Sequence, residues 1–460
     1  MNTSKNILNN IKKIHFIGIG GSGMYPIAKI LHSNGYIISG SDNYESDTLD
    51  REIQEGLQIY MGHDARNIDG AELIVYSAAI KQDNPEMIAG KEKNIPTIER
   101  SVMLGLLTSM YKNLIAVSGT HGKTTTTSMI TQILTVGGAD PTAIVGGTLP
   151  FIGGNSRTGN SETIVCEACE YVDTFLELDP AISVITNVEA DHLDYFKTFD
   201  RVIESFNKFA NKTTKFLVVN GDDENALKAV ANVNVPVTTF GFNKSNDYYV
   251  DDIAEERGFF RHFSVMKNET KLVDIELKVP GRHNAYNALA AICVADYMGL
   301  DLDSIAMALS DFGGVHRRFE VLGKVNDITI IDDFAHHPTE IENTLTTASK
   351  MGFDRVIAIF QPHTYSRTAT FLNEFGKALS IPDITVVSEI LAVREVNSYN
   401  IYSEDLVAKI KNGVYRKTFE DITDYIEKTA KPGDCVITMG GGNVYKCANM
   451  ILDNLKNKYK

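Results

Sequence analysis

Short apolar runs of strand length alternate with longer stretches of helical periodicity along nearly the whole chain. Such alternation predicts parallel sheets whose strands are joined by crossover helices. Three blocks can be distinguished, beginning at Ile14–Ile19, at Leu114–Val117 and near Leu322. We therefore predict an α/β fold with three domains, at residues 1–111, 112–321 and 322–460.

The expected elements follow from these runs. The first block is expected to hold strands at Ile14–Ile19, Tyr36–Gly40, Leu57–Met61, Glu72–Ala79 and Ile95–Ile98, and a helix at Glu99–Met110. The second is expected to add strands at Ala143–Gly147, Thr163–Cys169, Ala181–Val188 and Lys215–Asn220, antiparallel strands in Asp247–Pro280 and a helix from Asn284. The third is expected to hold strands at Ile328–Asp332, Val356–Phe360, Ile384–Ser388 and Cys435–Met439.

Charge and composition exclude some functions. The 460 residues carry a formal net charge of −15, which argues against nonspecific binding to nucleic acid or to an acidic membrane. No apolar run approaches the roughly 18 residues of a membrane span, and the N-terminus lacks the pattern of a signal peptide. We expect a cytoplasmic protein.

Cys166 and Cys169 form a C-x-x-C pair, for which we favour two strand cysteines over a redox or zinc site.

A glycine cluster follows the first predicted strand. It fits G-x-G-x-x-G and comprises Gly18, Gly20, Gly21, Ser22 and Gly23. The glycines allow a diphosphate to approach the backbone at a helix N-terminus, and Asp42 stands where a ribose-binding acid would follow the second strand. A turn that merely needs glycine, or the diphosphate of NAD, would give the same pattern.

A second glycine loop opens the second block and resembles a shortened P-loop. Val117 occupies the position of the first glycine of the usual motif. Backbone amides of the loop could point at phosphate oxygens, Lys123 would supply a charge near the β- and γ-phosphates, and Thr124 or Thr125 would offer a hydroxyl to Mg²⁺. The loop residues are Gly119, Thr120, His121, Gly122, Lys123, Thr124 and Thr125.

Carboxylates at strand ends suggest where the metal would bind. Glu167 ends one apolar run and Asp191-His192 follows another. The carboxyl ends of parallel strands share one sheet edge, so Glu167 is the natural magnesium ligand. His192 could hold a second divalent ion or belong to a surface turn.

The third block carries its own polar cluster. Asp332-Asp333 and His336-His337 follow an apolar run, and Arg367 follows another. Neighbouring histidines cannot both face one ligand in regular structure, so we expect one catalytic and one packed histidine. Arg317-Arg318, near the second domain boundary, could bring a cation to a phosphate.

Together these motifs resemble the Mur ligase family of peptidoglycan synthesis, and within it the branch that adds the first amino acid. The resemblance spans nearly the whole chain and rests on GIGGSGM at 18–24, SGTHGKTTT at 118–126, NVEADHLDYF at 187–196, GRHNAYNALAA at 281–291, HRRFE at 316–320, DDFAHHPTE at 332–340 and FQPHTYSRT at 360–368.

The resemblance implies three domains: a Rossmann-like N-terminal domain for the UDP-sugar, a P-loop ATPase-like central domain for ATP, and a Rossmann-like C-terminal domain that brings the amino acid. It implies ATP and Mg²⁺ as cofactors, UDP-N-acetylmuramate and L-alanine as substrates, and a monomer or weak dimer. The implied catalytic residues are Lys123, His336 and Arg367, the implied nucleotide contacts add Asn284, Asn287 and Arg318, the implied substrate contacts add His192 and Asp333, and the implied metal ligands are Thr124, Glu167 and His192.

Some positions depart from the family pattern. The chain has EACEYVD at 167–173, Phe334 and Ala335 in the histidine motif, and Thr364 where the family usually has an arginine. Thr364 lacks the positive charge of that arginine, which in the family lies near the amino-acid site. Two alternatives stay open: a murein-recycling ligase that attaches a tripeptide, and an NAD-dependent oxidoreductase, which leaves the second loop unused. A nucleotide-switch module would leave the third block unused.

Overall fold

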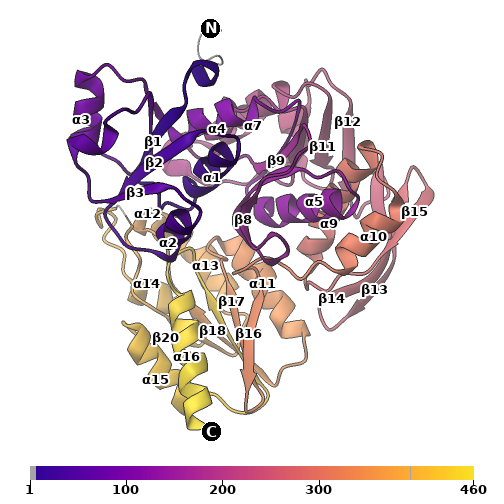
Figure 1. Ribbon diagram of the computed structural model, residues 1–460. Helices are drawn as coiled ribbons and strands as arrows, with labels where there is room; N and C mark the ends of the chain where they lie inside the picture. Colours follow the sequence, from indigo (N-terminus) through magenta and orange to yellow (C-terminus); the bar gives the residue numbers. More distant parts are fainter. Residues whose placement is uncertain (1–6, 394, 460) are drawn as a thin grey trace. The chain divides into compact units, whose positions relative to one another are not determined.

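The computed structural model describes residues 7–393 and 395–459 and consists of two compact units (Figure 1). The first unit contains the chain up to Tyr249 together with Met266–Thr270 and Asn287–Ala308. The second contains Val250–Val265, Lys271–Tyr286 and the chain from Leu309 onward.

A five-stranded parallel sheet opens the first unit, in the order β3-β2-β1-β4-β5. The elements of this part are η1 (Ile7–Asn10), β1 (Lys13–Ile17), α1 (Tyr25–Ser33), β2 (Ile37–Asp42), α2 (Asp47–Gln54), β3 (Gln58–Met61), η2 (Ala65–Ile68), β4 (Leu73–Tyr76), α3 (Pro85–Glu92), β5 (Thr97–Glu99) and α4 (Arg100–Thr108). Because β2 and β4 flank β1, the strand order reverses at the carboxyl end of β1, the usual place of a ligand crevice. Gly18 stands at that point.

A second sheet of the first unit runs in the order β13-β12-β11-β10-β6-β9-β7-β8. Its strands and the 3-10 turns between them are β6 (Asn113–Ser118), β7 (Thr142–Leu149), η3 (Pro150–Ile152), β8 (Gly154–Arg157), β9 (Thr163–Glu167), η4 (Tyr171–Glu177), β10 (Ile182–Ile185), β11 (Phe216–Asn220), β12 (Val237–Gly241) and the start of β13 (Tyr248–Glu256). The helices are α5 (Lys123–Val136), α6 (Leu193–Phe196), α7 (Phe199–Asn211) and α8 (Glu224–Val230), with most of α9 (Arg282–Tyr297) and α10 (Leu302–Ser310). Parallel neighbours flank β6 on both sides, so its carboxyl end lies in the middle of the sheet edge.

Helix α5 forms although its sequence begins KTTTTS, a poor run for a helix interior. All four threonines and Ser128 are buried. Ser128 and Thr131 donate their hydroxyl hydrogens to the carbonyls four residues earlier, each at 2.7 Å. The hydroxyl groups of Ser128 and Thr131 are therefore hydrogen-bonded although the helix is buried.

The second unit contains a mixed sheet in the order β16-β17-β21-β18-β19-β20, in which only the β16–β17 pair is antiparallel. Its elements are β16 (Glu320–Val325), β17 (Ile328–Asp333), α11 (Pro338–Lys350), β18 (Arg355–Phe360), α12 (Tyr365–Thr370), α13 (Leu372–Ala378), β19 (Ile384–Val387), α14 (Ser403–Val407), β20 (Gly413–Tyr415), α15 (Phe419–Thr429), β21 (Asp434–Met439) and α16 (Tyr445–Lys458). Helices α11 and α13 contribute to one apolar core and α15 and α16 to another, which is how a buried parallel sheet is covered on both faces.

Strands β13, β14 (Phe259–Lys267) and β15 (Thr270–Ile275) are neighbours in that order. Their two-residue connections permit only antiparallel pairing. The antiparallel segment expected in Asp247–Pro280 is therefore confirmed.

The predicted α/β architecture with three sheets is confirmed, and each predicted strand has a counterpart. The domain boundaries at residues 111 and 321 stay predictions. One detail was wrong: Cys169 is not a strand residue. Strand β9 ends at Glu167, because the chain then turns into η4, where Val172 and Asp173 adopt positive φ. Cys166 is buried in the strand and Cys169 is exposed.

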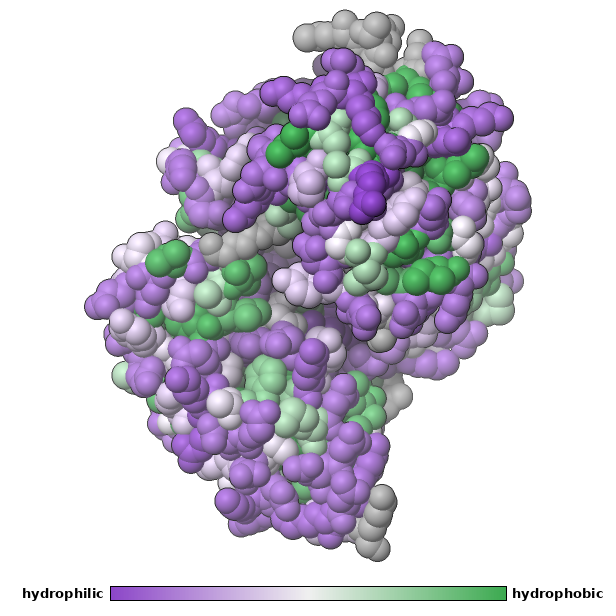
Figure 2. Space-filling view, turned by 60° about the vertical axis from the view of Figure 1, so that its left-hand side comes forward, coloured by the Kyte–Doolittle hydropathy of each residue, from purple (hydrophilic) through white to green (hydrophobic). Residues whose placement is uncertain are grey.

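Among residues 7–393 and 395–459 no helix is long and apolar enough to cross a membrane. Figure 2 shows a face on which hydrophilic residues predominate and hydrophobic ones form separate groups.

Candidate functional site

The first glycine loop is fixed to the end of β2. Gly18, with φ +79°, and Ile19 donate their N–H groups to the Ser41 carbonyl at 2.8 and 3.1 Å. Gly20 donates its N–H to the Asp42 carboxylate at 3.1 Å. Asp42, predicted from the sequence to contact substrate, thus holds the loop itself. A Cβ at Gly20 would lie 3.0 Å from Leu49 Cδ2 and 3.1 Å from Asp42 Oδ2, so a side chain there would require both neighbours to shift.

The second glycine loop is held at both ends of its turn. Gly119 has φ +138°, and a Cβ there would lie 2.0 Å from the Thr186 hydroxyl oxygen. Gly122 has φ +84°, and a Cβ there would lie 2.6 Å from Asn287 Oδ1. Asn187 fixes the turn, because it accepts the His121 N–H at 2.8 Å and donates to the His121 carbonyl at 3.0 Å.

Lys123 begins α5, with its ammonium turned toward the loop. The ammonium donates to the carbonyls of Gly119 and Thr120 and lies 3.0 Å from a carboxylate oxygen of Glu170. Burial lowers the pKa of Lys123, but the charge and hydrogen bond of Glu170, together with the charges of Cys169 and Glu167, outweigh this effect, and the pKa is raised overall. The lysine is therefore a fixed cation beside the loop.

Glu167 stands at the end of β9, in register with Val117 of β6. Its carboxylate accepts the Gly146 N–H at 2.5 Å. A Cβ at Gly146 would lie 2.5 and 2.6 Å from the two carboxylate oxygens, so the present position of the carboxylate depends on glycine. Thr124 is buried in the first turn of α5. Hydroxyl and carboxylate oxygens are the donors that Mg²⁺ prefers.

His192 lies further from its predicted strand end than the sequence suggested, because β10 already ends at Ile185. Its backbone has φ +54° and precedes α6. The imidazole lies 3.7 Å from the Asp191 carboxylate and its ring centroid 4.6 Å from that of Tyr171. Tyr171 directly follows Glu170 in the chain, which brings His192 to the same group of loops.

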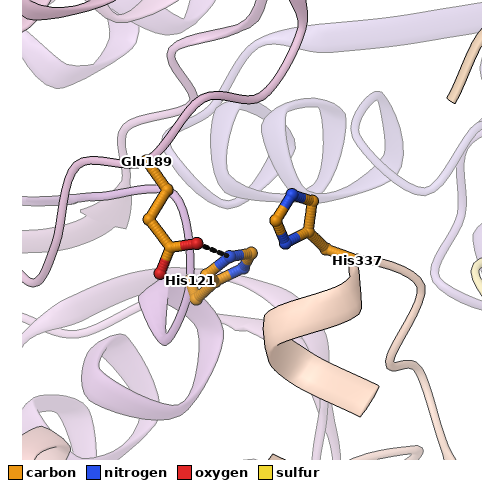
Figure 3. Close-up of side chains that lie close together, drawn as sticks. All are labelled: His121, Glu189 and His337. Carbon is orange, nitrogen blue, oxygen red and sulfur yellow. Dashed lines mark ion pairs between the residues drawn. The ribbon is translucent and has the colours of Figure 1, made fainter. Parts of the chain in front are cut away.

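His121 forms an ion pair with Glu189 at 3.6 Å when its imidazole is protonated (Figure 3). Glu189 also donates its backbone N–H to the Thr120 hydroxyl at 2.8 Å. The loop after β10 therefore supports the glycine loop after β6. Asn287 of α9 accepts the Thr126 hydroxyl hydrogen at 3.1 Å.

A cavity of about 160 Å³ lies between the two sheets of the first unit. Ser22, Gly23 and Arg100 line it from the first sheet, and Gly146 and Glu167 line it from the second. Asn155 donates its side-chain N–H to the Ser22 carbonyl at 3.1 Å. The first glycine loop and the strand end that carries Glu167 thus face one cavity.

In the second unit the arginine pair has two different environments. Arg317 donates to the Asp332 carboxylate at 2.9 Å and to the carbonyls of Gly440 and Gly442. Both guanidinium groups lie over the Phe334 ring, that of Arg317 at 4.9 Å and that of Arg318 at 5.0 Å. Arg317 therefore holds the sheet edge together, and the phosphate contact of Arg318 stays a prediction.

Asp333 is buried and accepts the backbone N–H groups of Phe319 and Ala335 at 2.8 and 2.7 Å. Burial raises the pKa of its carboxyl to about 6, although Arg318 opposes the rise. In this structure Asp333 organises the loop after β17. Asn284, also in the second unit, donates to the Pro280 carbonyl at 2.6 Å.

The two neighbouring histidines have different environments, and the catalytic role expected of one of them stays a prediction. His337 is buried, accepts the Thr339 N–H and caps α11 (it is also drawn in Figure 3). His336 lies with its ring centroid 6.0 Å from that of His363, at an interplanar angle of 70°. Arg367 Nη1 lies 3.4 Å from His363 Nδ1. His336, His363 and Arg367 therefore form a row along the carboxyl edge of this sheet.

Three supporting residues were missed by the sequence analysis: Glu170, Asn187 and Gly146. Glu170 and Asn187 lie in motifs that the sequence analysis had singled out, after β9 and β10, so strand-end polarity could have found them. Gly146 carried no such signal, because its role depends on β7 lying beside β9.

A phosphate-binding loop, an acidic strand end beside it and a second glycine loop across one cavity are typical of a nucleotide-using enzyme. Family models match three stretches of the chain: the Mur ligase family catalytic domain at 13–112, the Mur ligase middle domain at 117–295 and the Mur ligase glutamate ligase domain at 317–442. The chain belongs to the Mur ligase family, whose members are ATP-dependent ligases.

Relatives agree over almost the full length. A UDP-N-acetylmuramate--L-alanine ligase from Caldicellulosiruptor bescii is 45% identical over 96% of this chain and 98% of its own. One from Acetivibrio thermocellus is 43% identical over 96% of each. The solved UDP-N-acetylmuramate-alanine ligase from Thermotoga maritima is 30% identical, with a TM-score of 0.82 over 97% of this chain and 99% of that one. A murein peptide ligase from Psychrobacter arcticus is 26% identical, with a TM-score of 0.75 over the same shares.

Proposed function

We propose that this protein joins L-alanine to the lactyl carboxylate of UDP-N-acetylmuramate at the expense of ATP, in peptidoglycan precursor synthesis. Relatives that carry this activity in their names cover nearly the whole chain at 42 to 45% identity. We further propose a cytoplasmic enzyme that acts as a monomer or weak dimer.

The observation that carries this function is the shared cavity of the first unit. A carboxylate on a nucleotide diphosphate sugar and the γ-phosphate of ATP must meet for the first step. Ser22 and Gly23 of the first glycine loop and Glu167 at the end of β9 line the same cavity, and Lys123 lies 3.0 Å from Glu170, three residues beyond Glu167. This arrangement supports the proposal that the two glycine loops serve one reaction.

The residues present fit ATP and Mg²⁺. Glycines at 119 and 122 keep the backbone of the loop open, since a side chain would collide with Thr186 or Asn287. Lys123, Asn287 and Arg318 would contact the nucleotide, while Thr124, Glu167 and His192 would supply the oxygen and nitrogen donors of a divalent ion. When bound, such an ion would neutralise charge that gathers on the phosphate oxygens.

A carboxylate at neutral pH is a poor electrophile, so an amide can form only after activation. Transfer of the γ-phosphoryl group to the lactyl oxygen breaks the bond to ADP and gives an acyl phosphate. The neutral amine of alanine then attacks the carbonyl carbon, and inorganic phosphate leaves. Lys123 stabilises the charge of the transferring group, and His336 and Arg367 orient the amino acid. Water must be kept out, because the acyl phosphate would otherwise be hydrolysed, and closure of the domains would serve this purpose.

The test is ADP release from the purified protein with ATP, Mg²⁺ and UDP-N-acetylmuramate, to which alanine, glycine, serine or a tripeptide is added in turn. We expect the highest kcat/KM with alanine, and mass spectrometry should find the amide product. Lys123→Ala should lose turnover while its far-UV circular dichroism stays unchanged. No ADP release with any amine would overturn the proposal.

A tripeptide ligase is the second candidate, because a murein peptide ligase shares this fold at a TM-score of 0.75. Its lower similarity disfavours it. A higher kcat/KM for the tripeptide than for alanine in the same assay would establish it. Membership of the Mur ligase family gives no support to an NAD-dependent oxidoreductase.

A further inference from the structure

Glu86 is a fully buried carboxylate of the first unit that the steps described above do not use. It lies in the first turn of α3, whose N-terminal end is capped by Asn84. A negative charge is favoured at that end of a helix. A buried charge still needs hydrogen bonds in place of the water that it has lost, and the groups that supply them come from several elements.

Each carboxylate oxygen of Glu86 has its own partners. Oε2 accepts the Ser41 hydroxyl hydrogen at 2.6 Å and lies 3.1 Å from His63 Nδ1. Oε1 accepts a side-chain N–H of Asn67 at 2.6 Å and lies 3.7 Å from His15 Nε2. Burial raises the pKa of this carboxyl, but the polar contacts of His15, Ser41 and Asn67 outweigh burial and lower the pKa overall. The ionised carboxylate therefore connects β1, the end of β2 and the segment after β3.

Ser41 connects this carboxylate to the first glycine loop. Its hydroxyl donates to Glu86, while its main-chain carbonyl accepts the N–H groups of Gly18 and Ile19 at 2.8 and 3.1 Å. One residue at the end of β2 thus contacts Glu86 with its side chain and the start of the loop with its backbone. A shift of Ser41 would move both N–H groups of the loop.

A second connection runs through Asn67. The side-chain nitrogen that donates to Glu86 also donates to the Gly62 carbonyl at 3.1 Å. Gly62 donates its own N–H to the Asp42 carbonyl at 2.8 Å, and the Asp42 carboxylate accepts the Gly20 N–H at 3.1 Å. Both residues of β2 that hold the glycine loop are therefore connected to the same buried carboxylate.

We propose that Glu86 is a positioning residue for UDP-N-acetylmuramate: it holds the end of β2, so that the glycine loop keeps the form in which it binds the diphosphate. This inference rests on the proposed function. Because Glu86 is fully buried, it acts through Ser41 and Asp42. The sequence analysis did not select it, since its hydrogen-bond partners Asn67 and Ser41 lie 19 and 45 residues away in the chain.

The test compares Glu86→Gln with Glu52→Gln. Glutamine has nearly the same size but carries an N–H donor in place of one oxygen, so one side of residue 86 loses its acceptor. Glu52 is also fully buried in the first unit, and neither of its oxygens has a hydrogen-bond partner within the described residues. The same change therefore breaks no hydrogen bond at position 52.

Isothermal titration calorimetry would measure the Kd for UDP-N-acetylmuramate and for ATP separately. ADP release would give kcat and both KM values, and thermal unfolding would give the melting temperature. We expect Glu86→Gln to raise the Kd and KM for UDP-N-acetylmuramate by about tenfold or more, as for a lost hydrogen bond to a charged group. The Kd and KM for ATP should stay near the wild-type values, and Glu52→Gln should keep the wild-type values for both ligands.

Ser41→Ala provides a second, independent variant. It removes one donor to Glu86 but keeps the main-chain carbonyl that holds the loop. Binding of UDP-N-acetylmuramate should weaken here too, again without an effect on ATP. The double variant should weaken binding by less than the product of the two single effects, because residues of one hydrogen-bond network are coupled.

An unchanged Kd for UDP-N-acetylmuramate in folded Glu86→Gln would overturn the inference. Equal losses for the sugar nucleotide and for ATP would also overturn it, since they would indicate a general loosening of the protein. If Glu86→Gln does not fold, an unchanged Kd in Ser41→Ala has the same force. The wild-type protein separates the two proposals: if it neither binds UDP-N-acetylmuramate nor releases ADP with it, the proposed function fails and this inference fails with it, and if it does both, the variants judge Glu86 alone.

Discussion

The Lys123 ammonium lies 3.0 Å from a carboxylate oxygen of Glu170, and both side chains are largely buried. A buried ammonium is stable only with compensating charge and hydrogen bonds. Here Glu170 supplies the charge, and the carbonyls of Gly119 and Thr120 supply the acceptors. The position of the lysine is therefore set by the protein itself.

Glu170→Gln should weaken this arrangement. The pKa of Lys123, raised by Glu170 against the effect of burial, should fall, and the free energy of unfolding should drop by about 1–3 kcal/mol. Urea unfolding and ADP release would measure both effects. Glu177→Gln, in the same 3-10 segment but exposed, serves as the control. Wild-type stability and rate in Glu170→Gln would contradict the assigned role.

Gly146→Ala should displace the Glu167 carboxylate, because the new Cβ would lie within 2.6 Å of both oxygens. We expect the Mg²⁺ concentration for half-maximal activity to rise by about tenfold or more, since outer-shell changes commonly cost that much. Gly154→Ala, where no atom lies within 4 Å of a Cβ, should keep the wild-type Mg²⁺ dependence. Equal Mg²⁺ dependence of both variants would argue against Glu167 as a ligand.

Asp42→Ala should loosen the first glycine loop, because the Gly20 N–H loses its acceptor at 3.1 Å. The KM for UDP-N-acetylmuramate should rise about tenfold, as expected for a lost bond to a charged group, while the KM for ATP stays near the wild-type value. Asp50→Ala, at an exposed position of α2, is the control. A rise in the ATP KM alone would show that the loop does not serve the sugar nucleotide.

Glu52→Leu should stabilise the protein. Glu52 is fully buried in α2, and neither carboxylate oxygen has a hydrogen-bond partner in the described part of the chain. Burial raises its pKa to about 8, and Asp42 and Glu55 add to the rise. We expect a gain of about 1–3 kcal/mol near neutral pH from removal of an unsatisfied group.

The raised pKa of Glu52 also predicts how the free energy of unfolding changes with pH. As pH rises from about 4.3 the unfolded chain releases the Glu52 proton, whereas the folded protein keeps it until about pH 8. The folded state then binds more protons, so stability falls across this range and levels off above it. The difference in unfolding free energy between Glu52→Leu and wild type should therefore grow from pH 4.5 to pH 8. A constant difference would show that Glu52 titrates normally.

His336→Ala and His337→Ala should separate two roles. His337 caps α11 and is 4% exposed, so its loss should cost about 1 kcal/mol of unfolding free energy. His336→Ala should slow amide formation with a smaller effect on stability. Rapid-quench measurement of product and thermal unfolding would distinguish them. An unaffected rate in His336→Ala would reduce this histidine to a packing residue.

The central strands could be predicted because parallel strands covered on both faces are continuous apolar runs. Apolar runs of this kind form most of β6, β17 and β21. The edge strands could not. β8 has the sequence GNSR and β20 has GVY. The first is polar and the second has only three residues, so these segments become strands only because a neighbouring strand offers hydrogen-bond partners.

The candidate site was predictable where chemistry follows directly after a strand. Lys123 and Glu167 were found in this way, since strand ends in a parallel sheet share one edge. What could not be predicted was which groups hold them. Gly146 is 21 residues from Glu167 in the chain, and Asn187 is 66 residues from His121. Such contacts arise from strand order, for which the sequence offers no local signal.

The cavity between the two sheets of the first unit has a consequence for inhibitor design. A compound that fills it would contact Gly23 on one wall and Gly146 on the other. A side chain at Gly23 would press on Arg100 at 3.3 Å, and one at Gly146 would collide with Glu167. A mutation that excludes the compound by adding a side chain at Gly23 or Gly146 would therefore also disturb Arg100 or Glu167, and so would impair the enzyme itself.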